Sequence, residues 1–205
     1  PDEASPLHTK RLDSYEEGSE GIALYEFTSQ EFVPLNFWMV HSDQAVEPKQ
    51  VKLIPLSQTE FELLKLPFLS PDGNEHLQET FSAVRQHCGT DQPCALLAVR
   101  GIGPTAWDPS RTTHIHRRFA LLGQSLYAMR VWDIRKAVKA IRQIPHLADS
   151  SIELHASGEM AVLGVYAALW ESSVTQLILD SPPPSHREGP ILPFVSKILD
   201  VPQAI

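Results

Sequence analysis

The clearest candidate for chemistry in this sequence is a serine on a sharp turn. The run "ELHASGEMAVLGVYAALW" begins in a strand-like segment and continues in helix-forming residues, and Ser157 lies where the two meet. A serine is a poor nucleophile unless its hydroxyl is pushed clear of the sheet toward a basic group, and a tight strand-to-helix turn does this. Ser157 is therefore a candidate nucleophile for acyl transfer.

The residues around Ser157 leave its role open. A nucleophile turn has no room for side chains two positions before and after the serine, hence the usual pattern Gly-x-Ser-x-Gly. Here those positions hold His155 and Glu159. In a second register Gly158 is at the apex, and there is no nucleophile. In a third interpretation the turn only links strand to helix, and the Ser157 hydroxyl caps the helix through the backbone N–H of Glu159 or Met160.

A pair of histidines in the run "HIHRR" has the spacing of a metal site only if the chain is extended. His114 and His116 would then share a face. No third ligand is near, and Arg117 and Arg118 disfavour a cation. We therefore predict no metal and expect polar residues at a helix start or in a cleft.

Three tryptophans could contribute to ligand binding. Trp107, Trp132 and Trp170 could line a sugar-binding cleft. Trp132 and Trp170 lie in helix-forming segments, so packing against a sheet explains them more simply.

Cys88 and Cys94 bracket the short run "CGTDQPC". A disulfide across this turn would suit an exported protein, and two unrelated thiols are an equally simple interpretation. A zinc site would need further ligands that are not nearby. The state of the two cysteines stays open.

The composition excludes several classes of partner. The 205 residues carry a formal charge of -8, with 42% hydrophobic and 20% charged residues, which is ordinary for a globular domain. Nucleic acids and anionic membranes require a basic face, so we predict neither as a partner, and we predict no cofactor. No apolar run approaches the ~20 residues of a membrane helix. The chain opens on Pro1 without a signal-peptide pattern, which favours a mature or excised piece, and a secreted or periplasmic location is the working expectation.

The order of the predicted elements indicates an α/β fold. Residues 1–20 are polar and acidic and favour a leader or linker, and residues 21–205 are expected to form the domain. Antiparallel strands come first, and a mainly parallel sheet with helices on both faces follows. We expect the strands near 95–100, 152–156 and 175–180 to be parallel neighbours. The predicted strands are 21–29, 31–42, 49–57, 94–101, 151–156 and 174–181, and the predicted helices are 61–66, 74–88, 117–126, 129–144, 159–170 and 191–200.

This order resembles the α/β-hydrolase fold, in particular its acetylxylan-esterase and prolyl-oligopeptidase-like branch. Four stretches carry the resemblance: "AVRGIGPTAWD", "LLGQSLYAMRVWDIRKAVKAIRQI", "SIELHASGEMAVLGVYAALW" and "VTQLILDSP". They are similar to the strand-four motif, the segment before the nucleophile with Asp133 as its early acidic residue, the nucleophile elbow, and the next strand. The resemblance covers residues 20–205, and it implies a fold that is incomplete at the C-terminus.

The resemblance also implies an activity, that of a serine esterase acting on carbohydrate esters. Ser157 would be the nucleophile, and the backbone N–H of Gly158 would be one donor to the oxyanion. The second donor would come from the loop after the third strand, here residues 54–61, which contain no glycine. For Arg100 in the turn "RGIGP" we expect an ion pair with a neighbouring carboxylate.

In this family the acid and then the histidine follow the nucleophile. The one histidine after Ser157 is His186, with Asp180 and Glu188 near it. A loop histidine among prolines and charges favours a solvated surface position. Asp180 is expected at a strand end near the elbow, in a supporting role. A complete triad is therefore not visible in these residues.

Two functions stay open. The first is a carbohydrate-ester or related acyl hydrolase whose histidine lies outside this chain, with an ester-bearing carbohydrate or small acyl compound as substrate. The second is a catalytically silent α/β-hydrolase domain that serves as a scaffold or binding module. In both, we expect a partner chain or further domain to cover the sheet edge after residue 181, because an open edge promotes association.

Overall fold

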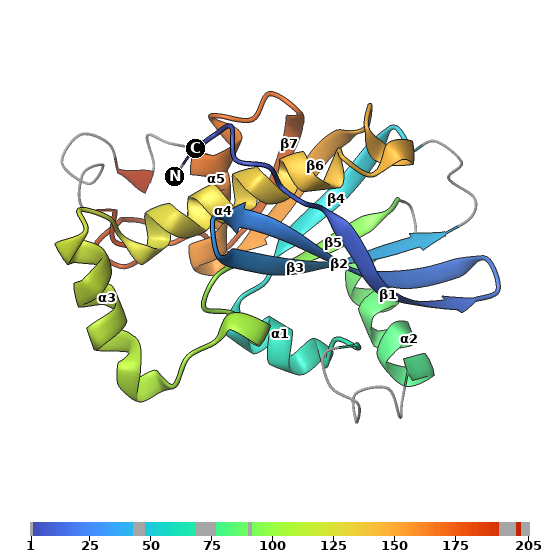
Figure 1. Cartoon of the computed structure of the whole chain (residues 1–205), viewed down its shortest axis with the longest axis horizontal. Coiled ribbons are helices and arrows are strands. Elements are labelled where there is room, and N and C mark those ends of the chain that lie inside the picture. Colours follow the sequence, from blue (N-terminus) through green and yellow to red (C-terminus); the bar gives the residue numbers. More distant parts are fainter. Residues whose placement is uncertain (1, 43–47, 69–76, 90–91, 193–199, 202–205) are drawn as a thin grey trace.

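A central seven-stranded sheet organises the chain (Figure 1). The computed structural model describes residues 2–42, 48–68, 77–89, 92–192 and 200–201. The strands are β1 (Lys10–Glu17), β2 (Glu20–Gln30), β3 (Val33–Ser42), β4 (Gln50–Pro55), β5 (Cys94–Ala98), β6 (Ser151–Ser157) and β7 (Val174–Asp180). Neighbouring pairs among β1, β2, β3 and β5 are antiparallel, whereas β5, β4, β6 and β7 are parallel. The expected α/β fold, with antiparallel N-terminal strands and a parallel remainder, is confirmed.

The strand order differs in one respect from the expected one. It is β1-β2-β3-β5-β4-β6-β7, so β4 lies between β5 and β6 and pairs in parallel with both. The expectation that β5, β6 and β7 are direct neighbours is therefore wrong for β5 and β6. The local alternation of apolar residues identifies strands, but it does not specify which distant strand each one joins.

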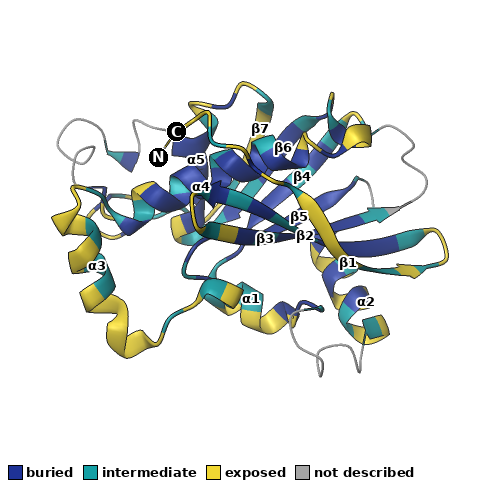
Figure 2. Cartoon of the chain, viewed as in Figure 1, coloured by how far each residue is buried: buried dark blue, intermediate teal, exposed yellow. Residues whose placement is uncertain are grey.

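Helices cover both faces of the sheet (Figure 1). They are α1 (Gln58–Leu64), α2 (Leu77–Cys88), α3 (Thr112–Leu121), α4 (Leu126–Ile141) and α5 (Gly158–Ala168). α4 and α5 pack against each other on one face, with α4 over β2 and α5 over β6. Strand β5 is buried at every position, as a central strand covered on both faces should be. α3 projects from the body and is mostly exposed (Figure 2).

The helix after the elbow lies close to the sheet because of a glycine. A β-carbon at Gly164 in α5 would lie 2.6 Å from Cδ2 of Leu154 in β6. A side chain at this position would force the Leu154 side chain to repack between α5 and the strand. Gly164 therefore helps to set the position of the turn that precedes α5.

A buried ion pair fixes α4 to the end of β5. Arg100, the residue of the "RGIGP" turn, is 8% exposed, and Asp133 on α4 is fully buried. The Arg100 guanidinium donates to both carboxylate oxygens, with Nη2–Oδ1 at 2.6 Å and Nε–Oδ2 at 2.8 Å, and the Arg100 backbone N–H also donates to Oδ2 at 3.0 Å. The Ser29 hydroxyl completes the site as a further donor to Asp133. The expected pairing of Arg100 with a carboxylate is confirmed.

The N-terminal region takes part in the fold. Lys10–Glu17, within the predicted leader, forms β1 and pairs with β2. Glu3 forms ion pairs with Arg135 and Lys139 of α4. The expectation of a leader without structure is wrong for these residues. An edge strand needs only ladder hydrogen bonds, and β1 is largely exposed, so its sequence carries no apolar period.

The helices expected at 61–66 and 129–144 begin three residues earlier, as Gln58–Leu64 and Leu126–Ile141. Two further helix predictions need comment. The helix expected at 117–126 runs instead from Thr112 to Leu121. It starts earlier because Asp108 caps a short 3-10 turn, Pro109–Arg111, that runs directly into α3. Most of the helix expected at 191–200 lies outside the described residues. Among the described helices, none has the length and apolar character needed to cross a membrane.

Candidate functional site

The turn after β6 has glycine, not serine, in the left-handed backbone region. Ser157 is extended, with φ -116° and ψ 151°, and α5 begins at Gly158, whose φ is +52°. In a nucleophile elbow the nucleophile itself occupies a strained, sparsely populated conformation. The geometry therefore matches the register with Gly158 at the apex, and Ser157 does not have the strained backbone that an active elbow would give it.

The hydroxyl of Ser157 points to a carboxylate on another element. Its Oγ donates to Oε1 of Glu60 at 2.9 Å, and it makes no capping hydrogen bond to α5. The expected capping of α5 by Ser157 is therefore wrong. His155 contacts Glu153, and Glu159 accepts from the Tyr127 hydroxyl at 3.5 Å, so neither large side chain reaches across the turn.

The carboxylate of Glu60 also accepts a hydrogen bond from a backbone N–H group in the loop after β4. Its Oε2 accepts from the backbone N–H of Ser57 at 2.7 Å, while the Ser57 hydroxyl accepts from the Glu60 N–H. This is a capping box at the start of α1. Burial acts to raise the pKa of Glu60, but hydrogen bonds from Ser57 and Ser157 outweigh it, and the pKa lies below its ordinary value. Glu60 is therefore a charged carboxylate at neutral pH.

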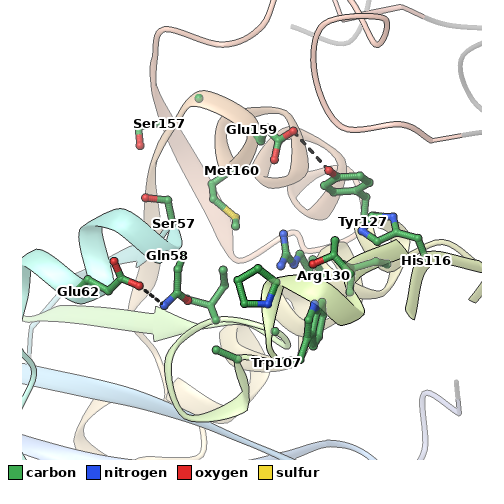
Figure 3. Close-up of a pocket in the computed structure, with 17 residues that line it drawn as sticks. Ser57, Gln58, Glu62, Trp107, His116, Tyr127, Arg130, Ser157, Glu159 and Met160 are labelled. Atoms are coloured by element: carbon green, nitrogen blue, oxygen red, sulfur yellow. Dashed lines mark hydrogen bonds between the residues drawn. The ribbon is translucent and has the colours of Figure 1, made fainter. Parts of the chain in front are cut away.

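A cavity of about 730 Å³ opens beside this turn. It lies at the carboxyl ends of parallel strands, where open α/β sheets usually bind ligands. The turn, the β4–α1 loop, the segment after β5, α3 and α4 all contribute to its lining. Figure 3 shows Ser57, Gln58 and Glu62 on one side of the cavity and Tyr127, His116 and Arg130 on the other, with Met160 between them and Trp107 below Arg130.

Arg130 is the buried charge in this lining. It is 8% exposed, and its Nε donates to the backbone oxygen of Arg100 at 3.1 Å. Its Cζ lies 5.9 Å from the ring centre of Tyr127. Burial is the main cause that holds the pKa of Arg130 below its ordinary value. Glu62 and Glu159, by contrast, are exposed at the rim.

The predicted acid and histidine lie apart from one another. Asp180 ends β7 opposite Ser157 in the β6–β7 ladder, and its carboxylate, which is exposed, accepts from the Ser181 hydroxyl. His186 is only 4% exposed, so the expectation of a solvated histidine is wrong. Its Nε2 bonds to the Tyr166 hydroxyl at 2.8 Å and its Nδ1 to the Pro190 oxygen at 3.0 Å, because the proline-rich segment packs against α5. His186 lines a different cavity from Ser157.

The histidine pair and the tryptophans have separate positions. His114 and His116 lie in α3, where residues two apart point to different faces. No cluster of three metal-ligating side chains occurs in the described part of the chain.

Trp107 lines the cavity and Trp132 is buried, but Trp170 is 71% exposed, so its predicted packing against the sheet is wrong. Trp170 follows the end of α5 and lies over Arg135 instead.

Cys88 and Cys94 are both buried and carry free thiols. Burial, followed by the neighbouring Cys88 thiol, raises the pKa of Cys94 well above its ordinary value. Neither residue lines the cavity at the elbow.

Sequence reasoning missed two residues of this site. Glu60 could have been found, because Ser57 and Glu60 have the Ser-x-x-Glu spacing of a capping box. Arg130 had no comparable signal, since a lysine- and arginine-rich amphipathic helix is usually exposed on its charged face.

Comparison with known proteins shows the fold. No family model matches the sequence, and no curated protein matches it. A candidate acetyl xylan esterase from Bacteroides fragilis NCTC 9343 superimposes with a TM-score of 0.64 at 12% identity, over 84% of this chain and 47% of that one. The acetyl xylan esterase 1 of Thermoanaerobacterium sp. JW/SL YS485 gives 0.60 at 13% identity, over 89% and 55%. The acetyl xylan esterase of Paenibacillus sp. R4 gives 0.58 at 18% identity, over 89% and 56%.

The strand order and these likenesses show that the chain has the α/β-hydrolase fold, which it shares with these acetyl xylan esterases. Glucuronoyl esterases share the likeness, with a TM-score of 0.57 for that of Solibacter usitatus at 12% identity, over 86% of this chain and 52% of that one. The chain spans about half the length of these solved structures.

Proposed function

We propose that this chain is a catalytically silent α/β-hydrolase domain that binds a small ligand in the cavity beside Gly158. The observation that carries the proposal is the φ of +52° at Gly158. The residue in the left-handed apex of the turn has no side chain, so it has no atom with which to attack a carbonyl. The nearest hydroxyl, that of Ser157, sits on the extended arm of the turn and donates to Glu60.

The charge of Glu60 supports the same proposal. An ester hydrolase of this fold forms an oxyanion during the reaction, and two backbone N–H groups stabilise it. One of these N–H groups lies in the loop after the third strand. Ser57 lies in the corresponding loop between β4 and α1, and its N–H already donates to Glu60. A carboxylate at that position would repel a developing negative charge instead of stabilising it.

The cavity has features of a binding site. It is large enough for a small ligand, and Trp107 and Tyr127 offer aromatic surfaces beside polar groups. The structural neighbours are named as esterases of acetyl xylan and of glucuronoyl groups. An acetylated or otherwise ester-bearing carbohydrate is therefore the first ligand to test.

A second function is favoured by the Ser157–Glu60 hydrogen bond. In principle, Glu60 could take the proton from Ser157 and allow it to attack an ester. A general base is most effective when its pKa lies near the working pH, and that of Glu60 lies below its ordinary value. Glu60 is therefore a poor base, and this esterase mechanism is the weaker proposal.

Turnover of p-nitrophenyl acetate separates the two functions. For a silent domain, we expect release of p-nitrophenol at the rate of buffer alone, unchanged in Ser157→Ala and Glu60→Gln variants. Turnover that disappears in Ser157→Ala would contradict the proposal and support the esterase.

Calorimetric titration with acetylated xylo-oligosaccharides, with and without a glucuronate substituent, tests binding. We expect Trp107→Ala to weaken the affinity at least about tenfold, as truncation of a central tryptophan usually does. The matched control is Trp170→Ala, since Trp170 lies outside the cavity lining. Equal effects of the two substitutions would place the ligand elsewhere.

A further inference from the structure

Arg130 has donor groups that the protein does not use. The side chain is more than nine-tenths buried, yet its one hydrogen bond within the described chain is from Nε to the Arg100 backbone oxygen. Among the described residues, no fully buried side-chain nitrogen lacks a partner. The two Nη atoms of Arg130 are therefore not fully buried, and Arg130 lines the cavity (Figure 3).

The neighbouring Arg100 shows what a satisfied buried guanidinium looks like in this fold. Arg100 binds both oxygens of Asp133 with its Nε and Nη2. Arginine is almost never buried without such a partner, because an unpaired buried charge is costly. Arg130 is equally buried, but no carboxylate in the described chain forms an ion pair with it. The missing partner of Arg130 has its place inside the cavity.

We propose that the cavity ligand carries a carboxylate that binds the Nη atoms of Arg130. The inference rests on the proposed binding function and names the chemistry of the ligand. A planar guanidinium fork matches the two oxygens of a carboxylate. The ligand's ring or chain then lies against Tyr127 and Trp107, which line the same cavity.

The other charges around the cavity favour a single negative charge over a phosphate. Among the described residues of the lining, Arg130 is the one buried cation, and His116 on α3 lies against the Tyr127 ring. Glu60 on α1 is held by Ser57 and Ser157, whereas Glu62 on α1 and Glu159 on α5 are exposed at the rim. Exposed charges are screened by solvent, so they weaken the attraction of a monoanion by Arg130 only modestly. A doubly charged phosphate would need more cations than the lining contains.

Matched pairs of acids and amides test the charge of the ligand. The probes are benzoate against benzamide and D-glucuronate against D-glucuronamide, titrated into the ¹⁵N-labelled protein. We expect each acid to bind at least ~10-fold more tightly than its amide, as a charge-assisted bidentate pair allows. We also expect the acids to shift the Arg130 Nε–H resonance more than any other arginine Nε–H resonance.

Variants decide which arginine is responsible. Arg130→Met should abolish the preference for the acid, and Arg130→Lys, which keeps the charge but loses the fork, should abolish most of it. Arg118→Met, on the exposed face of α3, is the control and should keep it. If acid and amide bind equally well in the cavity, the proposal of a carboxylate ligand is wrong, but the proposed binding function stands. If none of the four probes shifts the Arg130 Nε–H resonance, the proposed carboxylate is also wrong. The titration of the Trp107→Ala variant then tests the binding function separately.

Discussion

At Gly158 the backbone takes up a φ of +52°, where a β-carbon costs roughly 1–2 kcal/mol. Active elbows hold their nucleophile in such a strained position, and the surrounding structure compensates for the strain. Here glycine takes up this conformation without the strain of a β-carbon, and in our proposal the turn carries no nucleophile. The freed hydroxyl of Ser157 then serves as a donor to Glu60, whose carboxylate links the turn to the start of α1.

The charge of Glu60 should make a pH-dependent contribution to stability. Its pKa is lower in the folded chain than the ordinary value of 4.5. The charged form therefore stabilises the fold above about pH 4.5, and this contribution is lost as the pH falls through the lower folded-state pKa. Glu60→Gln keeps an acceptor for Ser57 and Ser157 but removes the charge. We expect it to reduce the free energy of unfolding at pH 7 by about 0.5–1 kcal/mol.

Urea unfolding between pH 3 and pH 7 measures this effect. The difference between Glu60→Gln and the unmodified protein should shrink as the pH falls below 4.5. Glu62→Gln, two residues further along α1 and exposed, is the matched control and should change stability little. A difference that stays constant with pH would show that the charge of Glu60 does not matter.

Individual residues of the site were only partly predictable from the sequence. The position of the turn, the absence of a visible triad and the doubt about Ser157 all followed from local spacing. The burial of Arg130 and His186 did not, because burial depends on which distant segments pack over a residue. His186 is covered by contacts with Tyr166, twenty residues earlier in the chain, and its flanking prolines and charges indicated solvent instead.

At the scale of elements, the Arg100–Asp133 pair joins the end of β5 to the middle of α4. Both charges are buried, so losing one leaves the other without a partner. Removing one member of a buried pair typically costs 3–5 kcal/mol. We expect Asp133→Asn to destabilise the fold by about 3 kcal/mol, since asparagine retains part of the hydrogen bonding.

A surface pair provides the comparison for this measurement. Lys10 and Glu26 pair at 2.8 Å across β1 and β2, with side chains 60% and 30% exposed. Exposed pairs contribute about 0–1 kcal/mol, so Glu26→Gln should have a small effect in the same urea experiment. Similar losses for both variants would mean that the Arg100–Asp133 pair does not hold α4 in place.

Elements were more predictable than their arrangement. Strands β5, β6 and β7 were expected close to their observed positions, because runs such as "CALLA" are apolar at every residue. The insertion of β4 between β5 and β6 depends on long-range pairing, which no local period encodes. β1 escaped detection because an exposed edge strand needs hydrogen bonds but no apolar face.

At the scale of the molecule, the sheet ends in two edge strands within the described chain, β1 and β7, and β7 is the more apolar of the two. β7 is the last strand in the order, and most of its residues are exposed. Leu177 and Ile178 are 37% and 42% exposed, so both faces of the strand present apolar side chains to solvent. Such an edge offers unpaired backbone groups and apolar surface to another strand, and we propose that a partner chain or segment covers it.

Self-association is the measurable consequence of this open edge for the chain by itself. We expect sedimentation velocity to show association that rises with protein concentration. Ile178→Lys should shift its midpoint at least ~10-fold upward, because an edge lysine opposes strand pairing. Leu121→Lys is the control, since Leu121 is 87% exposed but lies at the end of α3, away from the sheet. A chain that stays monomeric at every concentration, or one that responds equally to both lysines, would show that β7 is not the interface.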